Sequence, residues 1–308
     1  SRARSVYFSN SMGCDPFRDG HASQDMAAFG LSASVAGLRE RGVDSTTRSR
    51  NGCAMPATVE RLARYPVKGL SAEPLQRVRL AAGDGVCGDR RYALARADAP
   101  FDPARPAWLS KDNFLMLKRN ARLARLHARL EGDDGVLRLG EQGKRPIRAS
   151  VRDAAGRAKI VNFITRFMAG DIDAEPRFVE GAGGHQFSDH RTRVVSLINL
   201  ASVRALEDAA GRPLDPLRFR ANVYFDGVDA WEEFSWLEVG LAIGTARLRV
   251  TARIDRCAAV DVEPCSGERN TNLVRTLSKQ FDHVDMGVYA TVTAGGEIAV
   301  GDEIKPQG

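Results

Sequence analysis

The 308-residue sequence lacks paired cysteines at metal-site spacing, and it also lacks any long apolar run. An odd number of cysteines without a CxxC argues against a disulfide framework and against a four-cysteine zinc or iron–sulfur site. Reduced thiols in the cytoplasm are the better interpretation. No stretch approaches the roughly 18 apolar residues of a membrane span, and no secretory signal is evident. We therefore expect a cytoplasmic protein with no membrane span. The five cysteines are Cys14, Cys53, Cys87, Cys257 and Cys265.

Familiar catalytic and binding motifs are also scarce. The sequence has no GxSxG, no HExxH and no P-loop, and its five histidines show no metal-ligand spacing. His185 and His190 flank an acidic residue and could touch a ligand. Aromatic residues make up only 7%, whereas a nucleic-acid-binding barrel would need aromatics and cations interleaved on a strand face. The net charge of +6 comes without a block of like charges, which indicates a solubilising surface rather than an anionic partner.

Residues 1–54 differ from the rest of the chain. They are rich in Ser, Arg, Gly and Asp and show no sustained apolar periodicity, so they cannot bury enough apolar area to offset their ordering entropy. We expect a disordered N-terminal extension, either a native tail or an artefact of an upstream start. A targeting peptide is disfavoured by the scattered acidic residues. The folded protein is expected to begin near Met55.

Beyond this extension, short alternating apolar runs divided by glycine or proline predict strands. Helices are fewer, and the clearest has Ile160, Ile164 and Met168 on one apolar face. Asn199 could cap a second helix that ends at Gly211. This pattern predicts a mixed α/β, strand-rich fold with a barrel-like core. The predicted strands cover residues 59–65, 76–80, 91–95, 123–130, 136–139, 194–198, 222–225, 240–243, 247–252, 288–293 and 298–300.

Cys257 is the cysteine whose local context suggests chemistry. It follows Arg256 at the end of an alternating strand, in TARIDRCAAVDVEP. A neighbouring cation stabilises a thiolate, and the thiolate is the form that binds soft metals. From these residues alone, a buried inert cysteine is the better interpretation. The sequence around Cys257 decides between the two.

Five motifs in order resemble the MOSC family, which is named for the C-terminal domain of molybdenum cofactor sulfurase. Within it, the sequence is most similar to the mitochondrial amidoxime-reducing component and its bacterial counterparts. The resemblance extends over about residues 58–305. The motifs are YPVKGL at 65–70, GDRRYAL at 88–94, FRANVYFDG at 219–227, RCAAVDVEP at 256–264 and GVYATVTAGGEIAVGDEI at 287–304.

The resemblance implies a MOSC β-barrel with an N-terminal MOSC subdomain. The barrel would comprise residues 58–90 and 185–308, and the subdomain residues 91–184, with the molybdenum cofactor in the cleft between them. Cys257 would be the catalytic residue and the protein ligand to molybdenum. Cationic side chains there would give charge-assisted hydrogen bonds to the cofactor's phosphate and pterin. The implied cofactor-binding residues are Lys68, Arg90, Thr192, Arg193, Arg220, Asn222, Arg256 and Tyr289.

Three positions depart from the family pattern. Gly69 stands where the family often has serine, Ala221 replaces a proline, and Asp255 precedes the Arg-Cys pair where a small or polar residue is common. The loss of a hydroxyl at Gly69 and the added carboxylate at Asp255 bear on the substrate more than on the cofactor.

The function that the resemblance implies is a molybdenum-dependent reductase. It would reduce small N-hydroxylated or N-oxide compounds by oxygen-atom transfer, the cofactor supplying the chemistry and the protein supplying ligation and orientation. A separate electron-donor protein is expected, because the sequence has no flavin, haem or iron–sulfur motif. The alternative is a carrier of the cofactor or of sulfur without turnover. A nucleic-acid-binding barrel ranks far below both, so no nucleic acid is expected as a partner.

Overall fold

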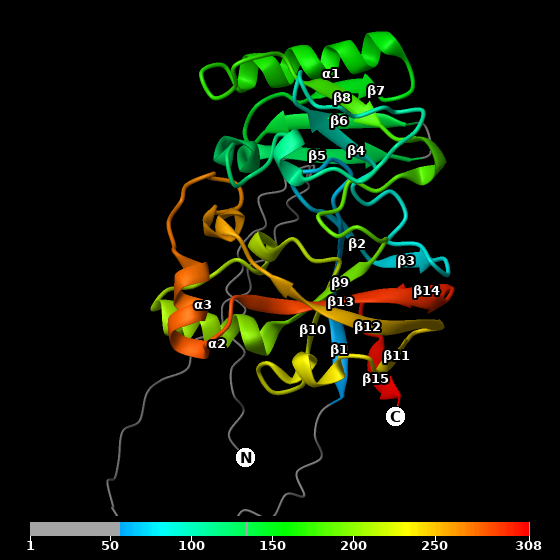
Figure 1. Ribbon diagram of the computed structural model, residues 1–308, viewed down its shortest axis with the longest axis vertical. Helices are drawn as coiled ribbons and strands as arrows, with labels where there is room; N and C mark the ends of the chain where they lie inside the picture. The colour runs from blue at the N-terminus through cyan, green and yellow to red at the C-terminus, as the bar shows by residue number, and fades with distance from the viewer. Residues whose placement is uncertain (1–55, 133–134, 308) are drawn as a thin grey trace, which may run out of the picture.

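The computed structural model describes residues 56–132 and 135–307. The predicted disordered extension, residues 1–54, therefore lies outside the described residues. Within the described ranges, no helix is both long and apolar enough to cross a membrane. Strands predominate and helices are few, so the predicted strand-rich mixed fold is confirmed (Figure 1).

A closed β-barrel forms the lower body in Figure 1. Its strands follow the order β10-β9-β13-β12-β11-β15-β1, and β10 pairs back to β1, which closes the ring. Closure leaves no free edge in this ring for pairing with another chain. A short strand, β2 (Glu73–Leu75), adds to β1 outside the ring. The barrel strands are β1 (Ala57–Arg64), β9 (Val195–Asn199), β10 (Val223–Asp226), β11 (Gly240–Ile243), β12 (Ala246–Asp255), β13 (Asp285–Ala294) and β15 (Glu303–Gln307).

The barrel interior follows from the alternation of its strands. Successive side chains of a strand face opposite sides of a sheet, and the inward set here is apolar. Val59, Leu197, Phe225, Leu248 and Val288 are all buried in one cluster. A hairpin-like pair of β3 (Arg77–Leu80) and β14 (Gly296–Ala299) lies beside this core and contributes Leu80 and Ile298 to it.

A second body contains the middle of the chain and lies above the barrel in Figure 1. It holds a three-stranded sheet, β5-β6-β7, and a two-stranded pair, β4-β8. The helix predicted from apolar spacing is α1 (Ala154–Phe167), whose Ile160 and Ile164 are buried against this sheet. The other elements are β4 (Tyr92–Ala95), β5 (Leu126–Glu131), β6 (Val136–Glu141), β7 (Ile147–Ser150) and β8 (Arg177–Glu180).

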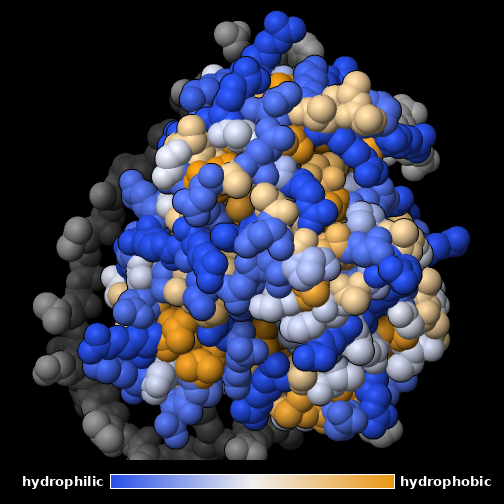
Figure 2. Space-filling view, turned by 45° about the horizontal axis from the view of Figure 1, so that its top comes forward, coloured by the Kyte–Doolittle hydropathy of each residue, from blue (hydrophilic) through white to orange (hydrophobic). Residues whose placement is uncertain are grey.

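Two further helices pack against the barrel, α2 (Leu200–Ala210) and α3 (Leu273–Phe281). The side chain of Asn199 caps α2, and Gly211 ends it in the left-handed conformation, both as the sequence predicted. The strand expected at 123–130 begins only at Leu126, because residues 121–125 form a 3₁₀ turn that buries Leu123. The face shown in Figure 2 is mostly hydrophilic, with apolar side chains gathered in small separate patches.

Candidate functional site

A cavity of about 270 Å³ lies between the barrel and the second body. We call it the cleft cavity. Most of the residues predicted from the sequence line it, although they are spread over more than 200 positions of the chain. The two exceptions are Thr192, whose hydroxyl contacts His190 Nδ1 at 2.9 Å, and Arg193, which pairs with Asp84. The predicted residues that line the cleft cavity are Lys68, Arg90, Arg220, Asn222, Arg256, Cys257 and Tyr289.

Cys257 lies where β12 leaves the barrel, and it contacts a cation that the sequence did not reveal. Its Sγ is 3.5 Å from Nζ of Lys111, which lies in the 3₁₀ turn Lys111–Asn113 of the second body. Burial lowers the pKa of Lys111, but Cys257 and the carboxylate of Asp189 raise it by more, so its pKa is raised overall. Lys111 therefore stays an ammonium beside the sulfur, and the contact joins the two bodies across the cleft.

Arg256, the cation next to Cys257 in the sequence, lines the cleft cavity and also binds the backbone of neighbouring segments. Its guanidinium donates to the backbone carbonyls of Met286 (Nε, 3.0 Å) and Phe219 (Nη1, 3.0 Å). It thereby fastens the start of the Cys257 loop to β13 and to the 216–219 turn. Burial lowers the pKa of Arg256, and no described carboxylate forms an ion pair with it.

Arg90 belongs to a buried ion pair rather than a surface one. Its partner Asp89 is fully buried and also accepts hydrogen bonds from the backbone N–H of Tyr65 (2.7 Å) and from Gln186 (3.1 Å). Burial lowers the pKa of Arg90, but Asp89, Tyr65 and Tyr289 together raise it by more, so its pKa is raised overall. Arg90 Nη2 donates to the carbonyl of Arg220 at 2.8 Å. Asp89 therefore fixes one wall of the cleft cavity.

Arg220 has no such counter-ion in the described part of the chain. Its Nη1 donates to the carbonyl of Leu70 at 2.7 Å, and its guanidinium lies 4.4 Å from the ring centre of Tyr65. Burial lowers the pKa of Arg220. A desolvated cation without an acid partner is costly, and a bound anion would remove that cost.

The other predicted residues are held firmly. Burial lowers the pKa of Lys68 although Asp189 opposes the shift, and its Nζ donates to the Phe187 carbonyl at 2.9 Å. Asn222 uses its side chain within the barrel, accepting from Ser196 Oγ at 2.9 Å and donating to the Ala63 carbonyl at 3.2 Å. Asn222 thus has little hydrogen-bonding capacity left for a ligand.

Tyr289 and the two loop histidines complete the local picture. Burial raises the pKa of Tyr289, so it keeps its phenolic proton at neutral pH. His190 lies against it, with ring centres 5.0 Å apart, and lines the cleft cavity. His185 packs instead on Phe187 at 4.8 Å and does not line the cavity. Of the two candidate histidines, His190 is the one positioned to touch a ligand.

One departure from the family pattern has a steric explanation. Gly69 has φ +84°, in the left-handed region that favours glycine. An added Cβ would lie 3.1 Å from the carbonyl oxygen of Leu115. A serine at this position would therefore be strained, whatever its hydroxyl could contribute.

The cleft cavity is strongly cationic. A cationic pocket concentrates anions, and within the described ranges no group of three or more His, Cys, Asp or Glu could hold a metal ion by itself. The other ligands of a metal bound to Cys257 would therefore have to come from a bound molecule. This donor set fits a metal held by an anionic organic ligand. The cationic residues lining the cavity are Lys68, Arg90, Lys111, Lys118, Arg218, Arg220 and Arg256, against the acids Asp189 and Asp255.

Comparisons with protein families cover almost the whole described chain. The family model of the MOSC N-terminal beta barrel domain matches residues 56–176, and that of the MOSC domain matches residues 182–305. The two matched segments correspond to the two sides of the cleft cavity only in part, because β1 belongs to the barrel.

The similar curated proteins are named molybdenum cofactor sulfurase. That of Drosophila melanogaster is 27% identical over 201 residues, which cover 58% of this chain and 26% of that protein. That of Anopheles gambiae is 33% identical over 108 residues, covering 31% and 14%. The chain thus spans about a quarter or less of the length of these relatives.

Two solved structures are similar at low identity. The YuaD protein from Bacillus subtilis has a TM-score of 0.39 at 14% identity, covering 81% of this chain and 94% of that one. YiiM from Geobacillus stearothermophilus has a TM-score of 0.31 at 18% identity, covering 37% and 54%.

Proposed function

The chain belongs to the MOSC family, and from this premise we propose that it binds the molybdenum cofactor in the cleft cavity, with Cys257 as the protein ligand to molybdenum. The observation that carries the proposal is the pairing of one thiol with an excess of half-buried cations. Arg220 and Arg256 find no carboxylate partner among the described residues, and Lys111 lies 3.5 Å from the Cys257 sulfur. A phosphorylated, sulfur-bearing cofactor would satisfy both features.

Different residues of the cleft cavity would bind different parts of the cofactor. Arg90, Lys68 and Arg220 would receive its phosphate and its oxygen-rich ring system by charge-assisted hydrogen bonds. Cys257 would supply a soft thiolate to the metal. When bound, the cofactor supplies two-electron oxygen-atom-transfer chemistry.

We propose that the reaction is the reduction of small N-hydroxylated or N-oxide compounds. Converting an N–OH group to N–H and water consumes two electrons and two protons. The electrons would come from a separate donor protein, and the protons from groups lining the cavity. His190 and Tyr289 stand at its edge in contact with each other, and Tyr289 holds its proton at neutral pH because burial raises its pKa.

A second candidate is a carrier of the cofactor or of sulfur without turnover. The observation in its favour is the printed name of the similar curated proteins, molybdenum cofactor sulfurase. The chain matches no more than about a quarter of the length of those proteins. A carrier would use the same cationic cavity and the same thiol, but it would not need a route for electrons.

The test combines metal analysis with turnover. We expect the purified full chain to contain molybdenum, to release a fluorescent oxidised pterin, and to reduce an N-hydroxyamidine with reduced methyl viologen as donor. Cys257→Ser should abolish reduction, while the exposed Cys87→Ser should match the wild type. Pterin without reduction would favour the carrier. Neither pterin nor molybdenum after expression in a cofactor-producing host would refute the proposal.

A further inference from the structure

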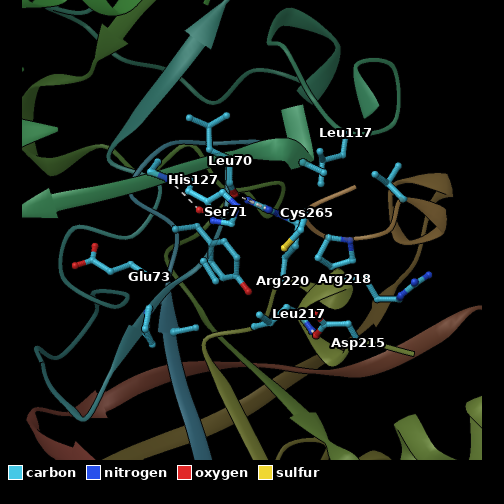
Figure 3. Close-up of a pocket in the computed structure, with 18 of the residues that line it drawn as sticks. Leu70, Ser71, Glu73, Leu117, His127, Asp215, Leu217, Arg218, Arg220 and Cys265 are labelled. Atoms are coloured by element: carbon cyan, nitrogen blue, oxygen red, sulfur yellow. Dashed lines mark hydrogen bonds between the residues drawn. The ribbon is translucent and has the colours of Figure 1, made fainter. Parts of the chain in front are cut away.

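A second cavity of about 330 Å³ adjoins the cleft cavity. We call it the side cavity. Figure 3 shows its lining, with Leu70 and His127 on one side and Leu217 and Asp215 on the other. Arg220 lines both cavities, whereas Cys257 lines only the cleft cavity. The side cavity is therefore a separate compartment that shares a wall with the proposed cofactor site.

The lining has the composition of a small-molecule site. Such sites are mostly apolar, with a few polar groups that orient the ligand. Both bodies contribute to the apolar part, so the cavity closes only when the two are docked. Ser71 Oγ in the wall already accepts a hydrogen bond from the backbone of Ala128 at 3.0 Å. The apolar lining residues are Ala63, Leu70, Leu117, Ala124, Ala128, Leu217, Val262 and Pro264.

The two acids in the wall are already engaged. Both carboxylate oxygens of Glu73 accept hydrogen bonds from the Arg64 guanidinium, at 2.9 and 3.0 Å. Asp215 accepts from the backbone N–H of Leu217 at 2.9 Å, at the start of the 216–219 turn. Neither carboxylate hydrogen-bonds to Arg220, so the acids of the cavity do not neutralise it.

Two arginines of the wall, the buried Arg218 and the half-buried Arg220, differ in whether a carboxylate compensates their charge. Arg218 is fully buried, pairs with Glu263, and donates to the Val260 carbonyl at 3.0 Å. Its charge is compensated. For Arg220, the hydrogen bonds within the described chain go to the carbonyl of Leu70 alone, and the facing ring is Tyr65.

Both contacts of the Arg220 guanidinium lie in the wall of the side cavity. Leu70 and Tyr65 line this cavity and do not line the cleft cavity. The guanidinium fork, which can hold a carboxylate by two parallel hydrogen bonds, is thus presented next to an apolar hollow. Burial of this cation, with no acid beside it, favours a ligand that carries the missing negative charge.

We propose that the side cavity binds a small organic monocarboxylate, with its apolar body among the leucine and alanine side chains and its carboxylate on Arg220. The inference goes beyond the cofactor role, with which it shares Arg220 but not Cys257. Because Arg220 also lines the cleft cavity, a ligand in the side cavity would change the charge that Arg220 presents to the cleft cavity.

Calorimetric titration of the full chain with benzoate and with benzamide, its uncharged counterpart, tests the proposal. We expect benzoate to bind and benzamide to bind at least about tenfold more weakly, since only the carboxylate can pair with a guanidinium. Leu217→Trp should fill the cavity and weaken benzoate binding by a similar factor. Leu237→Trp, at an exposed position outside both cavities, is the matched control and should bind normally.

Two further variants test whether Arg220 binds the carboxylate and which cavity holds the ligand. Arg220→Met should lose the preference for benzoate over benzamide. Lys111→Met changes the cleft cavity only and should bind benzoate as the wild type does. Absence of benzoate binding, equal binding of benzamide, or normal binding by Leu217→Trp would each overturn the proposal. So would loss of binding in Lys111→Met, which would place benzoate in the cleft cavity. Molybdenum content is a separate measurement on the wild-type chain. Benzoate binding can fail in a chain that contains molybdenum, and molybdenum can be absent from a chain that binds benzoate, so the failures of the two proposals are distinguishable.

Discussion

Replacing Arg90 with methionine would remove the cation from a pair whose acid, Asp89, is fully buried. Deleting one partner of a buried pair typically costs about 3–5 kcal/mol, because the other charge is left uncompensated. Asp89 would keep its hydrogen bonds from Tyr65 and Gln186, which favours the lower end of this range. At about 2–4 °C per kcal/mol for a domain of this size, the melting temperature should fall by roughly 6–15 °C.

Arg220→Met should behave differently, although the sequence assigns the two arginines the same role. It removes one hydrogen bond to a carbonyl, worth about 1.5–3 kcal/mol for a charged donor. It also removes a desolvated cation that no described carboxylate compensates, and this relief opposes the loss. The net change in the free energy of unfolding should therefore be within about 1–2 kcal/mol, while anion binding is lost.

Urea unfolding of both variants, followed by tryptophan fluorescence and circular dichroism, measures the contrast. Equal m-values would show that the midpoints report stability rather than a change in compactness. Phosphate titration of the folded variants gives the binding side. An Arg220→Met variant as unstable as Arg90→Met would show that Arg220 has an internal counter-ion, and the argument for an anion site would then be wrong.

Three further predictions concern single groups. Cys265→Ser should retain molybdenum and reductase activity, since Cys265 lines the side cavity and not the cleft cavity; an inactive Cys265→Ser beside an active Cys257→Ser would mean that the wrong cysteine was chosen. Lys111→Met should weaken phosphate binding by roughly fivefold in calorimetry, as about 1 kcal/mol from a partly exposed charge implies, whereas Lys305→Met at the exposed end of β15 should not. Burial raises the pKa of Glu233 above the usual range for a glutamate, so the unfolded chain ionises first and wild-type stability falls as pH rises from the ordinary pKa of a glutamate to the raised pKa of Glu233. Glu233→Gln removes this group, so the free energy of unfolding of the variant minus that of the wild type should increase with pH in urea titrations. A difference that stays constant would contradict the assignment.

Local patterns in the sequence predicted many of the elements, although they missed the strands β2, β7, β8 and β15. The spacing of Ile160 and Ile164 places α1, and the pair Asn199 and Gly211 marks both ends of α2. These features depend on residues close in sequence, through helical periodicity and capping. The strand predicted at residues 247–252 is β12, which continues to Asp255, two residues before Cys257.

Contacts between distant segments could not be predicted in this way. Lys111 lies 146 positions from Cys257, and its own neighbourhood is an unremarkable polar turn. The carbonyls of Phe219 and Met286, which accept hydrogen bonds from Arg256, are likewise distant in the sequence and could not be predicted. Which cation meets which group depends on how the second body docks on the barrel, and no local pattern encodes that docking.

The closure of the barrel has a consequence for biosynthesis. β1 pairs with β10 and with Glu303 and Ile304 of β15, so this strand needs partners that follow it much later in the sequence. Such long-range pairing is slow, because the entropy of closing a large loop is lost before the stabilising contacts form. A ribosome-bound chain cannot complete this ring until β15 has left the exit tunnel. The cleft and side cavities would then be assembled only after β15 has emerged, so any cofactor would enter a chain that is already synthesised through this strand.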